Sequence, residues 1–306
     1  MSSTDIRRMF MRDFKELEKR SALYATMIFL AYVGQILAAI LAGHLLLNMG
    51  TTTTIVGVAL LMVFIGTRFR GINNIVHECN HAAFTEDRQH NETFGKLAAA
   101  TIMTSFESYK SVHMTHHAHL GDYERDLDFQ NIQEYRLEDR LTTRTIVRHV
   151  MTPLVGLHLP KYLGADLSIR DGFRYGLLKV GLIFTAFAFA LIDPIATLIL
   201  LLVPFFWIYP AINYWTDCID HGGLLDADDE IAASRNLVLP RPVRFVLFPR
   251  NDCFHLIHHL FPTIPVHHFD RCHEMLLNDP AYRSSCKIRD IGRGTITETQ
   301  FKREGA

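Results

Sequence analysis

The stretch that decides the fold is Ser21–Leu47, SALYATMIFLAYVGQILAAILAGHLLL, which contains no Asp, Glu, Lys or Arg. A helix needs about 20 mostly apolar residues to cross a hydrocarbon core of ~30 Å. This run exceeds that length, is too long for the core of a signal peptide and is followed by no small-residue cleavage site. We therefore predict a membrane-spanning helix here, in preference to a secretory signal or a buried helix of a soluble protein.

Three further apolar segments, about 51–69, 175–192 and 195–212, approach the same length. The four segments pair through very short links at Asn48–Gly50 and Asp193–Pro194, which predicts two helical hairpins. Neither link contains Lys or Arg, whereas basic residues crowd the opposite ends of the segments. By the positive-inside rule, both tips face out, and both termini and the polar regions face the cytoplasm.

The expected fold class is an all-α integral membrane protein, in which two hairpins of four spanning helices carry a cytoplasmic helical cap. Residues 1–283 are expected to form one domain, with cytoplasmic parts at 71–172 and 213–283, and 284–306 a polar tail. Pro204 and Pro210 suggest a kink or an early end in the fourth segment. The short apolar run Leu97–Phe106 is expected at the membrane interface.

Histidine is the compositional anomaly, because three short clusters stand out among 17 histidines. They read HECNH at 77–81, HMTHH at 113–117 and HLIHH at 255–259. Positions i, i+3 and i+4 share one face of a helix, so each cluster can aim its imidazoles at one point. Imidazole binds Zn, Cu, Fe and Ni, and eight clustered histidines exceed the four ligands of a tetrahedral zinc. The count favours two metal ions, while the net charge of −1 gives no indication of a nucleic-acid partner.

One cluster supports a rival interpretation. Residues 77–81 also read H-E-x-x-H, the signature of zinc metalloproteases in which Glu78 would act as general base. A membrane zinc protease would need one further ligand and would leave both H-x-x-H-H clusters unexplained.

The order H-x-x-x-H, H-x-x-H-H, H-x-x-H-H, with hairpins before the first and between the last two clusters, resembles the membrane fatty acid desaturase superfamily. The resemblance covers roughly residues 60–275 and includes the acidic run Asp122–Asp128 and the HLFPxxP motif at 259–265. It implies two irons, O2 as co-substrate and a further ligand at His221. It also implies that Asp217 reaches the metal through water. The implied ligand set is His77, His81, His113, His116, His117, His221, His255, His258 and His259.

Ligating histidines usually donate their second N–H to a carboxylate or carbonyl. Glu78 and Asp126 are the candidates we single out for this role beside Asp217, and several other acids are close in sequence: Asp122, Asp128, Asp252 and Asp270. His119, two residues past the second cluster, is a candidate for a supporting role. We expect no ligand role for His149, and read His44, His267 and His268 as structural or surface residues.

Side-chain acid–base chemistry cannot break an unactivated C–H bond, so the reaction needs a cofactor. The resemblance implies an oxidoreductase that desaturates a fatty acyl chain or a lipid-like substrate, with a hydroxylase or ketolase acting on a carotenoid or other amphiphile as the alternative. The chain has neither a ferredoxin cysteine spacing nor a G-x-G-x-x-G motif. A separate donor, ferredoxin or cytochrome b5 with its reductase, is therefore expected, in a bacterial inner membrane or an equivalent one.

Overall fold

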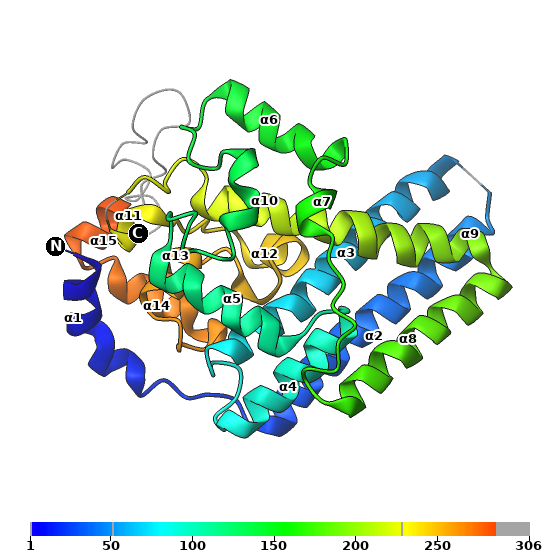
Figure 1. The fold of residues 1–306 in the computed structure, drawn as a ribbon, viewed down its shortest axis with the longest axis horizontal. Helices are drawn as coiled ribbons and strands as arrows, with labels where there is room; N and C mark the ends of the chain where they lie inside the picture. The colour runs from blue at the N-terminus through cyan, green and yellow to red at the C-terminus, as the bar shows by residue number, and fades with distance from the viewer. Residues whose placement is uncertain (1, 51, 228, 286–306) are drawn as a thin grey trace.

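The structure is a computed structural model that describes residues 2–50, 52–227 and 229–285, and this part of the chain is helical, without strands. Four long apolar helices project together to the right in Figure 1, and shorter helices gather at the other end. The expected all-α fold is confirmed, as is the number of candidate spanning helices among the described residues.

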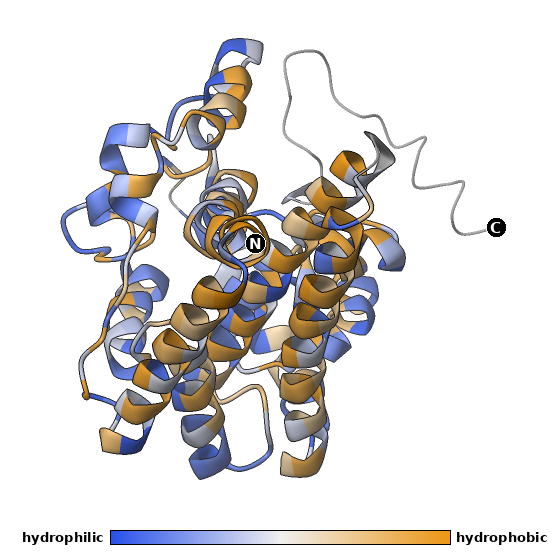
Figure 2. Cartoon of the chain, turned by 90° about the vertical axis from the view of Figure 1, so that its right-hand side faces the viewer, coloured by the Kyte–Doolittle hydropathy of each residue, from blue (hydrophilic) through white to orange (hydrophobic). Residues whose placement is uncertain are grey.

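The candidate spanning helices are α2 (Ala22–Leu47), α3 (Thr52–Asn80), α8 (Phe173–Ile192) and a continuous helix over Pro194–His221. Large apolar side chains such as Leu41, Phe184 and Leu191 remain exposed on them. Figure 2, which looks at this end of the molecule, shows these helices as mostly hydrophobic ribbons. Such an exposed apolar surface suits hydrocarbon rather than water.

Helix α3 is longer than the predicted segment 51–69, because it continues through the polar residues to Asn80. At ~1.5 Å per residue, 29 residues extend about 43 Å, which is more than the ~30 Å of a hydrocarbon core. The surplus at the C-terminal end carries Asn73, Asn74 and His77. The membrane helix itself therefore positions the first histidine cluster.

Of the two outcomes predicted at Pro204 and Pro210, a kink or an early end, the early end is wrong. The chain stays helical from α9 (Pro194–Thr197) through two π-helical turns, Leu198–Leu202 and Pro204–Ile208, into α10 (Tyr209–His221). Proline removes one backbone donor from a helix, and wider turns accommodate that loss within a membrane helix. As a result, His221 stands at the end of a helix that begins at the hairpin tip.

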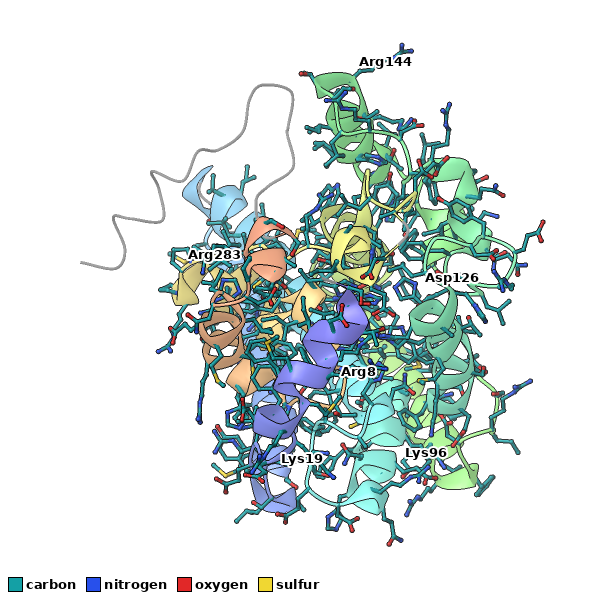
Figure 3. All side chains as sticks on the ribbon, turned by 90° about the vertical axis from the view of Figure 1, so that its left-hand side faces the viewer. Arg8, Lys19, Lys96, Asp126, Arg144 and Arg283 are labelled. Atoms are coloured by element: carbon teal, nitrogen blue, oxygen red, sulfur yellow. The ribbon has the colours of Figure 1, made fainter. Side chains whose placement is uncertain are left out.

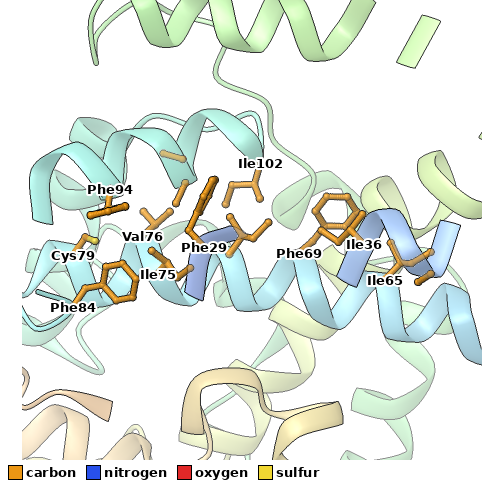
Figure 4. Close-up of a cluster of buried hydrophobic side chains, with 14 of the residues drawn as sticks. Phe29, Ile36, Ile65, Phe69, Ile75, Val76, Cys79, Phe84, Phe94 and Ile102 are labelled. Atoms are coloured by element: carbon orange, nitrogen blue, oxygen red, sulfur yellow. The ribbon is translucent and has the colours of Figure 1, made fainter. Parts of the chain in front are cut away.

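A cluster of buried apolar side chains holds the helical bundle together. Figure 4 shows Phe29 and Ile36 of α2 packed with Ile65, Phe69 and Ile75 of α3. Helix α4 (Arg88–Thr101) contributes its alanines, and α5 (Phe106–His119) begins with a phenylalanine that is 2% exposed.

The run Leu97–Phe106 packs against α3, and its position at the membrane interface stays a prediction. Its residues Ala98, Ala99 and Phe106 are buried in the apolar cluster against α3. The run lies at the junction of α4 and α5, two helices that pack on α3.

Shorter helices form the opposite end, which we call the cap. They are α1 (Ser3–Lys15), α6 (Thr143–Leu154), α7 (Leu159–Tyr162), α11 (Glu230–Ala233), α12 (Arg241–Leu247), α13 (His255–Leu260), α14 (Phe269–Leu276) and α15 (Pro280–Ser285). Figure 3 views this side, where the labelled charged side chains are Arg8, Lys19, Lys96, Asp126, Arg144 and Arg283.

Helix α1 supports the third histidine cluster from outside. Phe14 packs edge-on against Phe261, with ring centroids 4.8 Å apart. The Arg7 guanidinium donates to the carbonyl oxygens of Leu260, at 2.9 Å, and His259, at 3.1 Å. Helix α1 thus holds the backbone at the end of α13 in place. Of the expected tail, 286–306 lie outside the described residues.

Candidate metal centre

The histidine clusters lie on four segments that are distant in sequence. His77 belongs to the last turn of α3, and His81 follows directly after it. Helix α5 supplies three histidines and starts at an N-cap in which the Ser105 hydroxyl accepts from the Ser108 N–H. His221 ends α10, and α13 consists almost entirely of the third cluster. All nine predicted ligands therefore come from helices or helix ends.

The structure brings these nine residues into two groups. One group contains His77, His81, His113, His117 and His258, and the other contains His116, His221, His255 and His259. Within each group, one ring nitrogen of every member lies within 4.8 Å of those of the others. His116 and His117 are neighbours in sequence but belong to different groups, so the two sites adjoin.

The hydrogen-bond pattern of the first group leaves nitrogen lone pairs facing one another. His113 Nδ1 lies 3.2 Å from Asp128 Oδ2, so it carries the proton and leaves Nε2 bare. That Nε2 lies 3.1 Å from His81 Nε2 and 3.2 Å from His117 Nε2. His77 Nε2 is buried without a hydrogen-bond partner. A cation would satisfy these nitrogens together.

The second group shows the same pattern more sharply. His221 Nδ1 donates to the Ala233 carbonyl at 2.9 Å, and His255 Nδ1 lies 3.3 Å from the Asp220 carboxylate. Both Nε2 atoms are therefore free of protons, yet they lie 2.8 Å apart. His259 Nε2 approaches His255 Nε2 to 2.9 Å. The residues thus fit a metal ion, which neutral imidazoles bind through such lone pairs.

The supporting carboxylates differ in part from those singled out in the sequence. Asp126 lies as expected, with Oδ2 2.9 Å from His116 Nδ1. Glu78 instead forms an ion pair with Arg250, at 2.6 Å from Nη2 to Oε2. Asp217 accepts from the Tyr162 hydroxyl at 2.7 Å and faces the same cavity as the histidines.

Two supporting carboxylates were missed or left unranked. Asp220 was not considered, although it directly precedes His221. Asp128 was only one of several acids near the second cluster. The remaining acids of that group pair elsewhere: Asp122 with Arg125, Asp252 with Arg70 and Asp270 with Arg244.

Burial favours the neutral form of most histidines in the two metal groups. Desolvation, reinforced by neighbouring imidazoles, lowers the pKa of His117, His255, His258 and His259. Although burial opposes it, the Asp126 carboxylate raises the pKa of His116. Neutral imidazole is the form that binds metal, so the site is prepared for cations rather than for anions.

The other described histidines lie outside both groups. His149 contacts the Tyr214 hydroxyl at 2.7 Å, and His273 contacts the Tyr282 hydroxyl at 2.8 Å. His44 lies 3.0 Å from the Asp193 carboxylate and joins the two hairpin tips. His119 belongs to neither group. The sequence clusters plus His221 thus select the same nine residues as the geometry.

A cavity of about 450 Å³ adjoins the metal groups. Its walls include His77, His113, His116, His221 and His255. Parts of α3 and α10, the end of α7 with the residues after it to Asp166, and residues from 102–109 and 128–132 also line it. This volume lies within the range of small-molecule sites, so a substrate can reach the metal centre.

Comparison with known proteins identifies the family. The family model for fatty acid desaturase matches residues 52–287. The dihydrorhizobitoxine desaturase of Bradyrhizobium elkanii is 24% identical over 73% of this chain and 68% of its own.

Two relatives from Arabidopsis thaliana are the chloroplastic sn-2 acyl-lipid omega-3 desaturase (ferredoxin) and the endoplasmic-reticulum acyl-lipid omega-3 desaturase (cytochrome b5). They are 27% and 23% identical over 66% of this chain, and the matches cover 51% and 59% of their lengths. The chain thus spans about half to two thirds of these relatives. Because the family model covers most of it, the chain belongs to the fatty acid desaturase family.

Proposed function

We propose that this protein is an O2-dependent oxidoreductase that introduces a carbon–carbon double bond into a membrane-accessible substrate, either an acyl chain or another lipid-like amphiphile. Two hydrogen atoms leave adjacent carbons, two electrons come from a donor, and O2 with two further protons yields two molecules of water. The observation that carries the proposal is the pair of histidine groups at the end of the spanning helices.

We assign two iron ions to the two groups, with all nine histidines as ligands. When bound, the irons would supply the O2 chemistry that breaks unactivated C–H bonds. The protein's part is to hold the imidazoles neutral and correctly oriented. Asp126, Asp128, Asp220 and the Ala233 carbonyl do so through the Nδ1 atoms of His116, His113, His255 and His221. Asp217 is positioned in the cavity to reach a metal through water.

The electrons come from a separate protein in this proposal. Ferredoxin and cytochrome b5 are the two candidates, since the name of one Arabidopsis relative includes ferredoxin and that of the other includes cytochrome b5. Which of the two serves is decided by reconstitution with either donor and its reductase.

We further propose that residues 1–283 act as one domain, with both termini and the metal centre on the cytoplasmic side of a bacterial inner membrane or an equivalent one. The placement of Lys and Arg away from the tips at 48–50 and 193–194 supports this orientation. Single cysteines introduced at Asn48 and Arg8 in a cysteine-free background test it. In intact cells, a membrane-impermeant maleimide should label position 48 and leave position 8 unlabelled, and the reverse pattern would refute the orientation.

Two other reactions are considered. Hydroxylation or ketone formation on a carotenoid or another amphiphile would use the same centre. Zinc proteolysis is disfavoured because Glu78, its required base, is held by Arg250. Four histidines of a second group would also have no role in a one-zinc enzyme.

The test is reconstitution of the purified protein in nanodiscs with an electron donor under ¹⁸O2, followed by metal analysis and mass spectrometry of the products. Desaturation predicts two irons per chain and loss of two hydrogen atoms from the substrate without ¹⁸O incorporation. Incorporated ¹⁸O would establish the hydroxylase, and one zinc with no O2-dependent product would overturn both.

A further inference from the structure

Two spanning helices turn polar faces toward each other where they border the cavity. Arg70, Asn73, Asn74 and His77 of α3 all line it. Their spacing of i, i+3, i+4 and i+7 places them on one face of the helix. On α10, Asn213, Asp217, Asp220 and His221 follow a similar spacing and line the same cavity. The two polar faces thus form opposite walls of one cavity beside the histidine groups.

The rest of the cavity wall is polar as well. Of the 23 described residues that line it, four have aliphatic or phenylalanine side chains, Ile102, Phe129, Ile132 and Ala165, and three are tyrosines. Ligand sites of this size are usually lined mainly by apolar side chains with a few polar groups. In this cavity, polar and charged side chains outnumber apolar ones, and five of them are histidines of the metal groups.

Part of this polar surface has no partner within the protein. Asn73 is 8% exposed and makes no hydrogen bond to the described residues. Asn74 is 3% exposed; its amide donates to the Pro249 carbonyl at 2.9 Å, but its Oδ1 accepts from nothing. Buried polar groups without partners are unfavourable unless a ligand or water completes them. Asn74 Oδ1, which is buried, and the Asn73 amide are therefore free to accept from or donate to a group bound in the cavity.

Arg70 keeps this surface in place. Its guanidinium donates to both oxygens of Asp252, at 2.8 and 3.1 Å, and to Asn213 Oδ1 at 3.1 Å. It therefore joins α3, α10 and the loop before α13, and its charge is neutralised. The acids Asp166 and Asp217 border the cavity and accept hydrogen bonds from the hydroxyl groups of Ser108 and Tyr162. Such surroundings accept N–H and O–H donors from a ligand.

We propose that the substrate is a compact polar amphiphile, whose amine or hydroxyl groups bind Asn73 and Asn74 beside the carbons that are oxidised, and not a long acyl chain. The inference rests on the proposed function and narrows its substrate class. Methylenes packed against the asparagines would leave their amides unpaired, so the cavity rejects a long acyl chain, whereas hydrogen-bonding groups near the reacting carbons satisfy them.

The test compares 2-aminooctanoate with octanoate, two probes that differ by one ammonium group, and adds stearoyl-coenzyme A as the long-chain probe. Binding to iron-loaded protein in nanodiscs is measured as thermal stabilisation, and turnover as probe-dependent O2 consumption. We expect 2-aminooctanoate to bind at least about tenfold more tightly than octanoate. Equal affinities, no binding of 2-aminooctanoate, or preference for stearoyl-coenzyme A would overturn the proposal.

The Asn73→Leu variant ties the selectivity to the α3 face. It removes the carboxamide at nearly constant volume, and should cut the preference for 2-aminooctanoate over octanoate by about tenfold. Asn278→Leu, a change of the same type at an exposed cap position, should leave it unchanged. An unaltered preference in Asn73→Leu, in protein of normal iron content and thermal stability, would refute the assignment.

The two proposals fail in different ways. In one outcome, 2-aminooctanoate binds selectively, but neither the probes nor an extract of the native cells supports O2 consumption. The proposed oxidase function then fails, while the polar binding site stands. If stearoyl-coenzyme A is desaturated by the wild-type protein, the function stands and the polar substrate class fails.

Discussion

At the scale of single residues, the described histidines divide into nine that form the two groups able to hold a metal and others that pack elsewhere. His116 is buried, its Nδ1 is held by Asp126, and its ring lies 5.0 Å from that of His221 and 5.1 Å from that of His259. Its environment therefore leaves one lone pair directed at the second group.

His116→Ala should lose at least one iron per chain and nearly all activity, because it removes one of four ligands. Metal analysis and O2 consumption of purified protein measure both. His90→Ala, at an exposed residue outside both groups, is the control and should keep iron and activity. His149→Ala should also retain its iron. If it loses metal as completely as His116→Ala does, the proposed ligand set is wrong.

His149 should contribute a pH dependence to stability. Burial, with Arg148 as neighbour and against the opposing effect of Asp139, lowers its pKa to about 4. Since its pKa in the unfolded chain is near 6.5, the folded state binds the proton more weakly. The contribution of His149 to the free energy of unfolding is therefore complete above pH 6.5 and is lost as the pH drops toward 4.

The measurement is the melting temperature between pH 7 and 4 of the wild type and His149→Gln in nanodiscs. The wild type should lose more stability over this interval than the variant. Equal losses would show that His149 does not stay neutral in the folded protein.

At the scale of elements, the close contact between α2 and α3 depends on glycine. A Cβ added to Gly71 of α3 would stand 2.1 Å from Cε1 of Tyr32 in α2. Small residues allow membrane helices to approach each other in this way. Gly71 lies on the same helix as Asn73, Asn74 and His77, which line the cavity.

Gly71→Ala should destabilise the protein by about 1–3 kcal/mol, because Tyr32 or a helix must shift. Gly34→Ala is the matched control, since a Cβ there meets nothing within 4 Å, and it should be neutral or slightly stabilising. Denaturant or thermal unfolding in detergent compares them. Equal stability of the two variants would mean that the α2–α3 contact is looser than described.

At the scale of the whole molecule, the metal groups connect α3, α5, α10 and α13, which are otherwise separated by long stretches of chain. A ligand bound only by the folded state stabilises it by mass action. Metal should therefore stabilise the cap as well as catalyse the reaction.

Removal of iron with a chelator should lower the melting temperature by about 5 °C or more, since metal at a hundredfold excess over its Kd contributes about 2.7 kcal/mol. Readdition of ferrous iron should restore it, and His116→Ala should respond less. A melting temperature that is insensitive to the chelator, in protein shown to lose its iron, would exclude this stabilising role.

The sequence by itself determined the four spanning helices and the nine histidines. Length and hydropathy decide whether a segment prefers hydrocarbon, and the i, i+3, i+4 spacing of the clusters is local information. Even the position of His221 followed from family resemblance before any geometry was known. Local pattern was therefore sufficient for the fold class and for eight of the nine candidate ligands, and the resemblance added His221.

Only the tertiary structure decided how these residues divide and what surrounds them. Helix rotation and contacts between distant segments decide three features of the site. His116 and His117 join different groups, and Asp220 rather than Glu78 supports a histidine. Helices α3 and α10 also share a polar cavity. The burial of Ala98, Ala99 and Phe106 against α3 and the continuation of the fourth helix past Pro204 depend on such contacts as well. The hydropathy of a residue predicts that it avoids water, but tertiary packing decides whether it contacts lipid or protein.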